Sequence, residues 1–244
     1  MFHFLRLLYP EVCPFCGKEL PYPQKTCCNA CFEKLWRLKH KTCLVCGRRF
    51  LYDETAATVC ADCRGHRFPY ETIVAPLSYN APVRSAILAY KYRMHYGHSR
   101  AFADLMVRAL HEKLPNLCVS AVFFVPTSAR RFAQRSFCPA EWLARAVAKK
   151  LKVPVHYSLK KCRDTPAQSA VSPEDRRRNL KDAFVCTASL TGQSVLLVDD
   201  VCTTGSTVKE CAKALKKAGA AHVYVVVLAR VEKPRGTVKT SSAL

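Results

Sequence analysis

The sequence predicts an α/β protein in which a mostly parallel sheet has helices on both faces and follows a small metal-held module. From residue 71 onward, short apolar runs alternate with amphipathic stretches, as strands and helices do in βα units. Before residue 68 the chain instead contains four Cys-x-x-Cys pairs and few long apolar periods. We therefore expect the module over residues 1–68, the α/β domain over 69–231 and a disordered tail over 232–244.

The expected elements follow from the spacing of apolar residues. Strands are expected where apolar runs are short and uninterrupted, at residues 72–79, 120–126, 194–200 and 222–230. Helices are expected where apolar residues recur three and four positions apart, at residues 82–92, 99–114, 139–151 and 206–220. The polar stretch 160–182 is expected to be a long functional loop.

The charge of the chain points to a polyanionic partner. There are 39 basic and 18 acidic residues, and the formal net charge is +21. Eight zinc-bound thiolates and two zinc ions would lower this only to about +17. Clusters of arginine suit phosphate groups, so a partner that carries phosphates is expected. A solvated basic surface is the alternative.

The start of the chain and its apolar stretches bear on location. The first apolar run is broken by Arg6, and no small-residue cleavage site follows it. The apolar stretches 119–129 and 220–229 are shorter than the roughly 20 residues that cross a bilayer. We expect a soluble, cytoplasmic protein without membrane insertion.

Residues 194–207 have the pattern of a phosphate cradle. A buried strand delivers Asp199 and Asp200 at its carboxyl end, where open α/β sheets bind ligands. A turn of hydroxyl residues and glycine then enters a helix, whose first N–H groups and dipole favour an anion. The candidate ligands of the phosphate are Val201, Thr203, Thr204, Gly205, Ser206 and Thr207. The carboxylates would face sugar hydroxyls and magnesium. The alternative, an ordinary capped helix after two solvated aspartates, does not account for the whole pattern.

These residues resemble the phosphoribosyl pyrophosphate (PRPP) motif of type I phosphoribosyltransferases. Together with the cysteine pairs, they make the chain similar to the ComF (ComFC) family of bacterial competence proteins over residues 10–230. That family joins a double zinc ribbon to a domain with the type I phosphoribosyltransferase fold. The resemblance implies catalytic roles for Asp199 and Asp200 and a role in handling single-stranded DNA during natural transformation, with other DNA-uptake proteins as possible partners.

The resemblance also assigns residues outside the cradle. Lys91 lies in the family's lysine-bearing helix, and Val125, Pro126, Thr127 and Ser128 form the candidate pyrophosphate loop. The polar loop supplies further residues that would border the active face, which are Arg163, Thr165, Gln168, Arg178 and Asn179.

One run departs from the family pattern. The family has Arg-Gly-Phe-Asn-Gln or Arg-Gly-Tyr-Asn-Gln, whereas this chain has Arg135, Ser136, Phe137, Cys138 and Pro139. The change removes backbone freedom and two amide side chains beside the expected site.

The four cysteine pairs indicate two zinc ions. They are Cys13 and Cys16, Cys28 and Cys31, Cys43 and Cys46, and Cys60 and Cys63. Two such pairs complete a tetrahedral thiolate site, and closed sites of this kind are structural. Sequential pairing is favoured and interleaved pairing stays open, while Cys27 is a spare beside Cys28. Redox-active or merely buried cysteines are the alternative.

Arginines form two further clusters. Arg130, Arg131 and Arg135 are expected in one loop, and Arg176, Arg177 and Arg178 in another. With Arg163, they are candidates for contact with phosphate or nucleic acid. The aromatic residues available for stacking on bases are Tyr90, Tyr92, Phe132 and Phe137.

Three functions remain open at this stage. The first is a ComF-type protein that binds PRPP or a related ribose phosphate and handles single-stranded DNA. The second is a salvage phosphoribosyltransferase that acts on a base or amine. The third is a catalytically silent adaptor.

Overall fold

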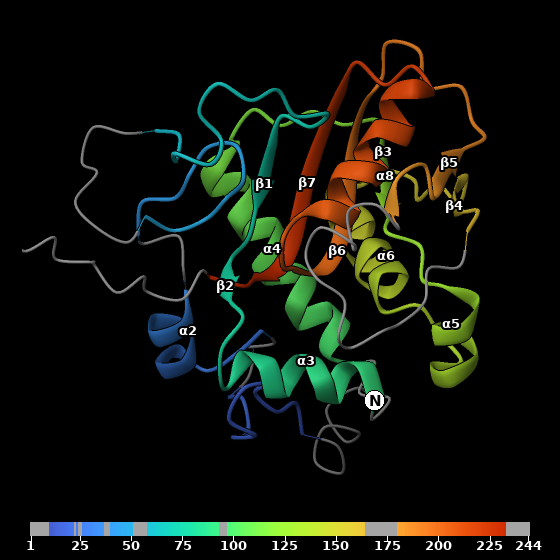
Figure 1. The fold of residues 1–244 in the computed structure, drawn as a ribbon. Coiled ribbons are helices and arrows are strands. Elements are labelled where there is room, and N and C mark those ends of the chain that lie inside the picture. Colours follow the sequence, from blue (N-terminus) through green and yellow to red (C-terminus); the bar gives the residue numbers. More distant parts are fainter. Residues whose placement is uncertain are drawn as a thin grey trace, which may run out of the picture.

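A computed structural model shows how the chain is arranged (Figure 1). It describes residues 10–21, 23, 26–36, 40–50, 58–92, 97–163 and 180–232; for Arg130 and Arg131 it describes the backbone alone. Across these residues, every helix is too short or too polar to cross a membrane.

The centre of the fold is a parallel sheet with the strand order β1-β7-β6-β3, and β2 also pairs with β7. The strands are β1 (Thr72–Val74), β2 (Leu77–Ser78), β3 (Ala121–Phe124), β6 (Ser194–Cys202) and β7 (His222–Arg230). All of their pairings are parallel. β1 and β2 together form the expected strand 72–79, which breaks at Pro76 because proline has no N–H for the ladder.

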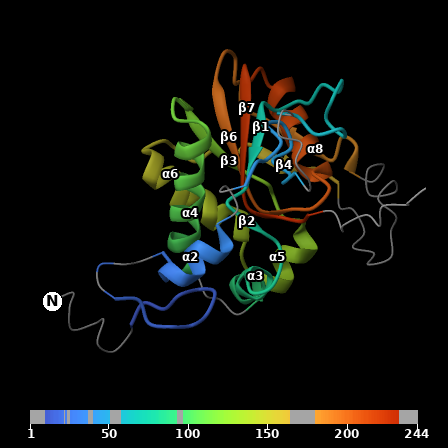
Figure 2. The same ribbon diagram turned by 90° about the vertical axis from the view of Figure 1, so that its left-hand side faces the viewer.

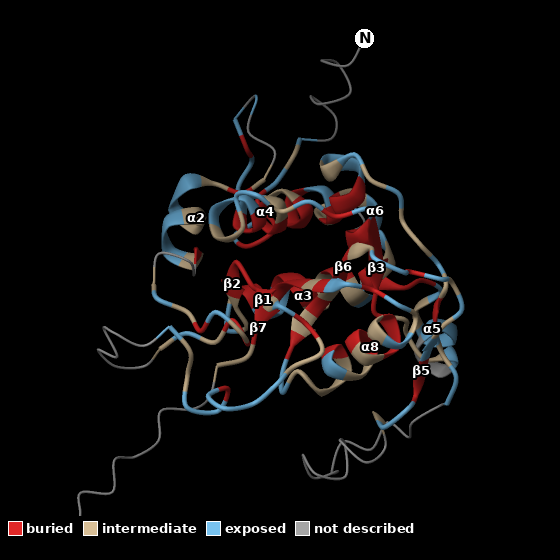
Figure 3. Ribbon diagram, turned by 90° about the horizontal axis from the view of Figure 1, so that it is seen from above, coloured by how far each residue is buried: buried red, intermediate tan, exposed pale blue. Residues whose placement is uncertain are grey.

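Helices cover both faces of this sheet. They are α4 (His98–Lys113), α6 (Pro139–Leu151) and α8 (Ser206–Lys217), whereas α3 (Val83–Tyr92) lies below the sheet in Figure 1, beyond the carboxyl ends of β6 and β7. Figures 2 and 3 show α4 and α6 on one side of the sheet and α8 on the other. The predicted mostly parallel sheet with helices on both faces is therefore confirmed.

The period of two along β6 explains this layering. Leu196 and Val198 join the hydrophobic cluster that contains α4 and α6. Val195 and Leu197 join the cluster that contains α8. Because successive side chains of a strand point to opposite faces, a strand that is apolar throughout needs cover on both sides.

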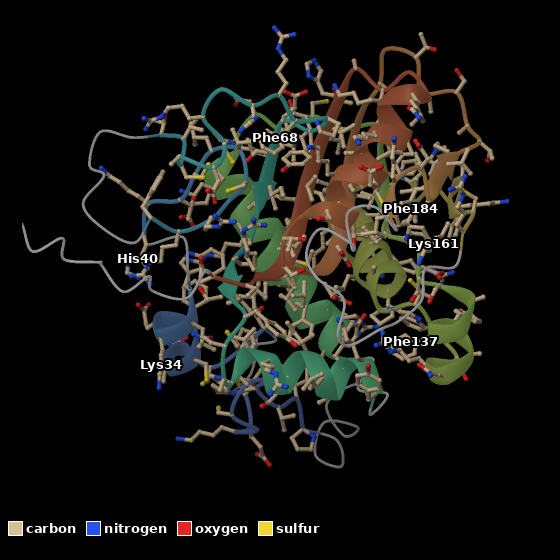
Figure 4. All side chains as sticks on the ribbon, in the orientation of Figure 1. Lys34, His40, Phe68, Phe137, Lys161 and Phe184 are labelled. Carbon is tan, nitrogen blue, oxygen red and sulfur yellow. The ribbon has the colours of Figure 1, made fainter. Side chains whose placement is uncertain are left out.

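Four elements were not expected from the sequence. Residues 129–135 form helix α5 (Ala129–Arg135) where a loop was predicted, and that prediction was wrong. The strands β4 (Leu159–Lys161) and β5 (Phe184–Cys186) form an antiparallel pair, in which Lys161 lies opposite Phe184 (Figure 4). The cysteine module contains helix α2 (Asn29–Leu35). All four are too short for apolar periodicity to identify them.

Candidate functional site

The carboxyl end of β6 brings the acid pair to the edge of the sheet. Asp199 accepts a hydrogen bond at Oδ1 from the backbone N–H of Asp200, at 2.8 Å. Asp200 is only 8% exposed, and Lys91 of α3 donates to its Oδ1 at 2.6 Å. Lys91 and Asp200 are 109 residues apart in sequence, so the fold brings together two residues that the sequence named separately.

Tyr90 fixes the end of α3 that carries Lys91. Its buried hydroxyl donates to the carbonyl of Pro139 at 2.9 Å. Its ring packs edge-on against Phe102 and Phe137, with centroid distances of 5.6 and 6.2 Å. Burial raises the pKa of Tyr90, so the phenol stays neutral and acts as a donor. Tyr90 and Phe137 are both buried, so the expectation that they stack on DNA was wrong.

The turn after β6 carries the residues predicted to bind a phosphate. Gly205 has φ +83° and ψ 2°, a left-handed conformation that a side chain disfavours, and α8 starts at the next residue. The Thr204 hydroxyl accepts from the Ser206 N–H at 3.3 Å and lies 2.9 Å from the Ser206 hydroxyl. Thr203 and Thr204 are exposed. Val201, Gly205, Ser206 and Thr207 are partly exposed, so the turn is open to an approaching anion.

The loop after β3 lies beside the acid pair. β3 pairs with β6, and the Val125 N–H donates to the Val198 carbonyl at 3.0 Å. Pro126, Thr127 and Ser128 therefore follow at the same edge of the sheet, and all three are partly exposed. The structure thus places the candidate pyrophosphate loop, 126–128, and the candidate phosphate turn, 203–207, at the same edge of the sheet.

The atypical run 135–139 also borders this edge. Cys138 precedes α6 and is buried; burial, with a contribution from the negative charge of Asp199, raises the pKa of its thiol to about 11. Ser136 has φ +59°, in the left-handed region where the family's glycine has no steric cost. Ser136 therefore carries some backbone strain at the position where the family motif has glycine.

The candidate arginines have different surroundings. The Arg135 guanidinium lies 4.5 Å from the centre of the Tyr92 ring and donates to the Tyr92 hydroxyl at 2.6 Å. Arg130 and Arg131 lie in α5, and Arg163 is exposed. The other candidates lie outside the described residues; they are Thr165, Gln168, Arg176, Arg177, Arg178 and Asn179.

The cysteines form two groups of four. The first is Cys13, Cys16, Cys28 and Cys31, and the second is Cys43, Cys46, Cys60 and Cys63; within each, the sulfur atoms lie within 4.8 Å of one another. We call these the first and the second cysteine site. Cys16 and Cys28 have their sulfurs 3.7 Å apart, as do Cys46 and Cys60. Four Zn–S bonds of about 2.3 Å in a tetrahedron place the sulfurs about 3.8 Å apart, so both sites fit zinc.

The grouping is sequential, as favoured from the spacing. Cys27 belongs to neither group but packs in the core, where burial raises the pKa of its thiol to about 12. Cys28, and not Cys27, belongs to the group whose four sulfur atoms lie within 4.8 Å of one another, so Cys28 is the candidate ligand at this position.

Sequence reasoning missed two groups of residues near these sites. Arg230 and Cys202 lie at the ends of β7 and β6, and the Arg230 Nη1 donates to the Cys202 sulfur at 2.6 Å. Trp142, Arg145 and Tyr157 form an exposed aromatic and basic cluster on and beside α6. The net charge could have directed attention to Arg145, whereas only the fold reveals the pairing of Arg230 with Cys202.

Comparisons with known proteins match both parts of the chain. The family described as "Phosphoribosyl transferase domain" matches residues 140–242, and the family described as "Double zinc ribbon domain" matches residues 4–64. These matches, with the two cysteine sites, confirm the predicted phosphoribosyltransferase-type fold and the two zinc ions.

Three named relatives are similar along most of their length. The Competence protein F of Haemophilus influenzae is 29% identical, over 89% of this chain and 96% of its own. The DNA utilization protein YhgH of Salmonella typhimurium is 29% identical, over 92% and 99%. The Competence protein ComFC of Streptococcus pneumoniae is 25% identical, over 83% and 87%.

Proposed function

We propose that this chain, a homologue of the ComF and YhgH proteins, binds PRPP or a related ribose phosphate with magnesium. We also propose that it handles single-stranded DNA during DNA uptake. Its double zinc ribbon and phosphoribosyl transferase domain support this proposal. One observation supports the first part above all. An acid pair at a strand end leads through a left-handed glycine into the N-terminus of a helix, at the edge where α/β sheets bind ligands.

Each group in the cradle has a role in this proposal. The turn 203–207 binds the terminal phosphate through backbone N–H groups and hydroxyls. Asp199 and Asp200 bind the ribose hydroxyls, and their carboxylates are the ligands that magnesium prefers. Magnesium would screen the negative charge of the pyrophosphate. The loop 126–128 faces the pyrophosphate from the neighbouring strand.

Lys91 would change partner when the ligand binds. Its ammonium group is now held by Asp200 at 2.6 Å, and both side chains are largely buried. A pyrophosphate carries more negative charge than one carboxylate, so it competes for Lys91 and leaves Asp200 free for the sugar. The ion pair thus keeps the site ordered before the ligand arrives.

Calorimetry with PRPP and magnesium tests the cradle. We expect the double variant Asp199→Asn, Asp200→Asn to lose at least about tenfold in affinity, because each lost charged hydrogen bond is worth about 1.5–3 kcal/mol. Asp104→Asn is the matched control, because Asp104 forms its ion pair with Lys150, between α4 and α6. Unchanged affinity in the double variant would remove the cradle proposal.

A substrate screen separates binding from catalysis. Pyrophosphate release from PRPP with a defined base or amine would favour the salvage enzyme. Binding without turnover favours a regulatory or DNA-handling role. If the chain binds neither PRPP nor DNA, the catalytically silent adaptor is the function that remains.

The exposed face of α6 supports the proposed contact with DNA. Trp142, Arg145, Lys149 and Lys152 are all exposed, at spacings of three, four and three residues along α6 and its C-cap. We call them the α6 stripe. Tyr157, which is 50% exposed, adds a second ring: the Arg145 guanidinium lies 6.0 Å from the Trp142 ring and 5.9 Å from the Tyr157 ring. Proteins bind single-stranded nucleic acid with aromatic rings that stack on the bases and with basic side chains that contact the phosphates. This surface offers both.

Fluorescence anisotropy with oligo(dT) across a salt series tests this surface. We expect Trp142→Leu to weaken binding about tenfold, because stacking on one base is worth about 1–3 kcal/mol. Lys149→Gln should reduce the salt slope by about one unit. Phe132→Leu tests the competing surface, because Phe132 is an exposed ring on α5 that the sequence also offered for stacking, beside the arginines first considered. If only Phe132→Leu weakens binding, the DNA path runs along α5 instead.

A further inference from the structure

Arg135 meets Tyr92 where the end of helix α5 lies beside the end of helix α3 (Figures 1 and 2). The Arg135 guanidinium lies 4.5 Å from the centre of the Tyr92 ring, and its Nη2 atom donates to the Tyr92 hydroxyl at 2.6 Å. The two residues are 43 positions apart in sequence, so this contact joins two separate helices at their last residues.

The contact lies where α3 no longer has a buried face. The buried residues of this helix are Val83, Ala86, Ile87 and Tyr90. Lys91 is partly exposed, and Tyr92 is 61% exposed. The last carbonyls of a helix have no partner within it, so helix ends fray unless other contacts hold them. Beyond Tyr90, this end of α3 is held by Arg135 through Tyr92 and by Asp200 through Lys91.

Lys91 lies between two tyrosines that contact the same segment. Tyr90, one residue before it, donates to the Pro139 carbonyl at 2.9 Å. Tyr92, one residue after it, accepts from Arg135. Both tyrosines therefore contact the atypical run in which the sequence departs from the family pattern. Successive residues of a helix point about 100° apart, so Lys91 leaves α3 in another direction and reaches the acid pair.

The sequence suggested a different role for Arg135, as a direct contact for phosphate. A guanidinium is planar, with its donors in a fixed fork. Here its carbon lies over the Tyr92 ring and one of its nitrogens donates to the hydroxyl of the same residue, which fixes its orientation. A phosphate contact alone does not account for the tyrosine, whereas a role in holding the end of α3 does.

We propose that Arg135 is a positioning residue that, through Tyr92, holds the last turn of α3 so that Lys91 faces Asp200. Arg135 then acts on PRPP binding through Lys91 and not by touching a phosphate. The effect on affinity rests on the proposed PRPP site, whereas the effect on the position of Lys91 does not.

The reactivity of Lys91 in the full protein, without PRPP, tests its position. A lysine that a carboxylate holds reacts slowly with an acetylating reagent, because the carboxylate stabilises the charged, unreactive form. We expect Arg135→Met to speed acetylation of Lys91 at least about fivefold, because the lost contact combines a cation–π pair and a hydrogen bond. Lys150, which pairs with Asp104, is the internal reference and should not change. Mass spectrometry measures both rates.

Hydrogen exchange in the same variant tests the end of the helix. Exchange should speed up in residues 89–92 of α3 and stay unchanged in residues 100–106 of α4. No response of either Lys91 or residues 89–92 to Arg135→Met would overturn the proposal.

Arg145→Met is the matched control. Arg145 also contacts a tyrosine, since its guanidinium lies 5.9 Å from the Tyr157 ring and its Nε donates to the Tyr157 hydroxyl at 2.9 Å. Loss of this second arginine–tyrosine pair, on and beside α6, should leave Lys91 and α3 unchanged. An effect on Lys91 as large as that of Arg135→Met would contradict the proposal.

A double-mutant cycle with PRPP and magnesium separates positioning from direct contact. We expect Arg135→Met alone to weaken PRPP binding at least about fivefold. In the Lys91→Met background the same change should add less than about twofold, because the two residues act through one connection. Full additivity of the two changes would mean that Arg135 contacts the ligand itself, which contradicts the proposal.

Conservative variants sharpen the same test. Tyr92→Phe keeps the ring and loses the hydrogen bond, so it should weaken binding less than Arg135→Met does. Arg135→Lys keeps a cation beside the ring and should restore part of the affinity. If Tyr92→Leu left the affinity unchanged while Arg135→Met lowered it, the connection through Tyr92 would be wrong.

Failure of the two proposals can be told apart. If the wild-type protein binds no PRPP, the proposed function fails, and the acetylation and exchange rates still decide whether Arg135 positions Lys91. If PRPP binds but these rates are the same in the wild type and in Arg135→Met, the positioning role alone is wrong.

Discussion

The two cysteine sites share a local design but are attached to the rest of the molecule differently. In both, the first cysteine N–H bonds to a carbonyl five residues later at 2.8 Å, and a glycine N–H bonds back to the first cysteine at 2.9 Å. The knuckles of the first site are held by side chains, as where Phe15 lies 6.1 Å from Phe102. Its backbone bridge to the sheet, between Trp36 and Leu77, lies after α2 and outside the knuckles, and Trp36 also donates to Glu112 at 3.2 Å. The second site is held by the backbone bond between Val45 and Ile73. Side-chain contacts can rearrange, whereas a backbone contact leaves little room for change.

The largest difference between the two sites is expected when zinc is removed. Structural zinc contributes about 10–16 kcal/mol of binding free energy per site in small zinc peptides, so a strong chelator should unfold residues 10–68 before the sheet. The first site should lose its zinc earlier, because Cys16 is exposed whereas Cys43, Cys46 and Cys63 are buried. Limited proteolysis with mass spectrometry, followed over time, measures the order of the two events. Resistance of both sites to proteolysis after zinc is gone would contradict the assignment.

Alanine at the two knuckle glycines should have the next largest effect. Gly17 and Gly47 have φ of +72° and +64°, so alanine costs about 1–2 kcal/mol of unfolding free energy at either. At Gly47 the new methyl would also collide with the Ile73 carbonyl, whereas nothing lies within 4 Å at Gly17. We expect Gly47→Ala to cost about 3 kcal/mol or more, since overpacking adds about 1–3 kcal/mol. Urea unfolding of both variants measures the difference, and equal losses would mean that the second site is not fixed by its backbone contact.

The aromatic contacts of the first site should tolerate substitution best. The Arg108 guanidinium of α4 lies 4.3 Å from the Phe32 ring and 5.5 Å from the Trp36 ring. Because Arg108 is exposed, Arg108→Met should cost only about 0.5–1 kcal/mol. Thermal unfolding and the rate of zinc release from the first site measure this loss. A loss as large as that of Gly47→Ala would remove the distinction between the two kinds of attachment.

Some features of the molecule could be read from local patterns. The sheet strands were identifiable because their apolar runs are buried on both faces, and the cysteine pairs because zinc chemistry fixes their spacing. The candidate phosphate turn could be located because Gly205 and the hydroxyls around it follow the acid pair directly in sequence. In contrast, α5 and the pair β4–β5 were missed, because elements of seven and three residues show no periodicity of their own.

The sequence by itself determined the parallel sheet, the four cysteine pairs and the acid pair that leads into α8, because each depends on residues close together in the chain. Spacing favoured sequential zinc sites, and only the structure decided against interleaved ones. The tertiary structure decided that Lys91 pairs with Asp200, that Arg230 meets Cys202, and that Trp142 and Tyr157 flank Arg145. These pairs join residues on different elements, and their contacts depend on how the elements pack. A largely buried charge such as that of Lys91 acquires its role only when packing places its counter-charge, Asp200, beside it.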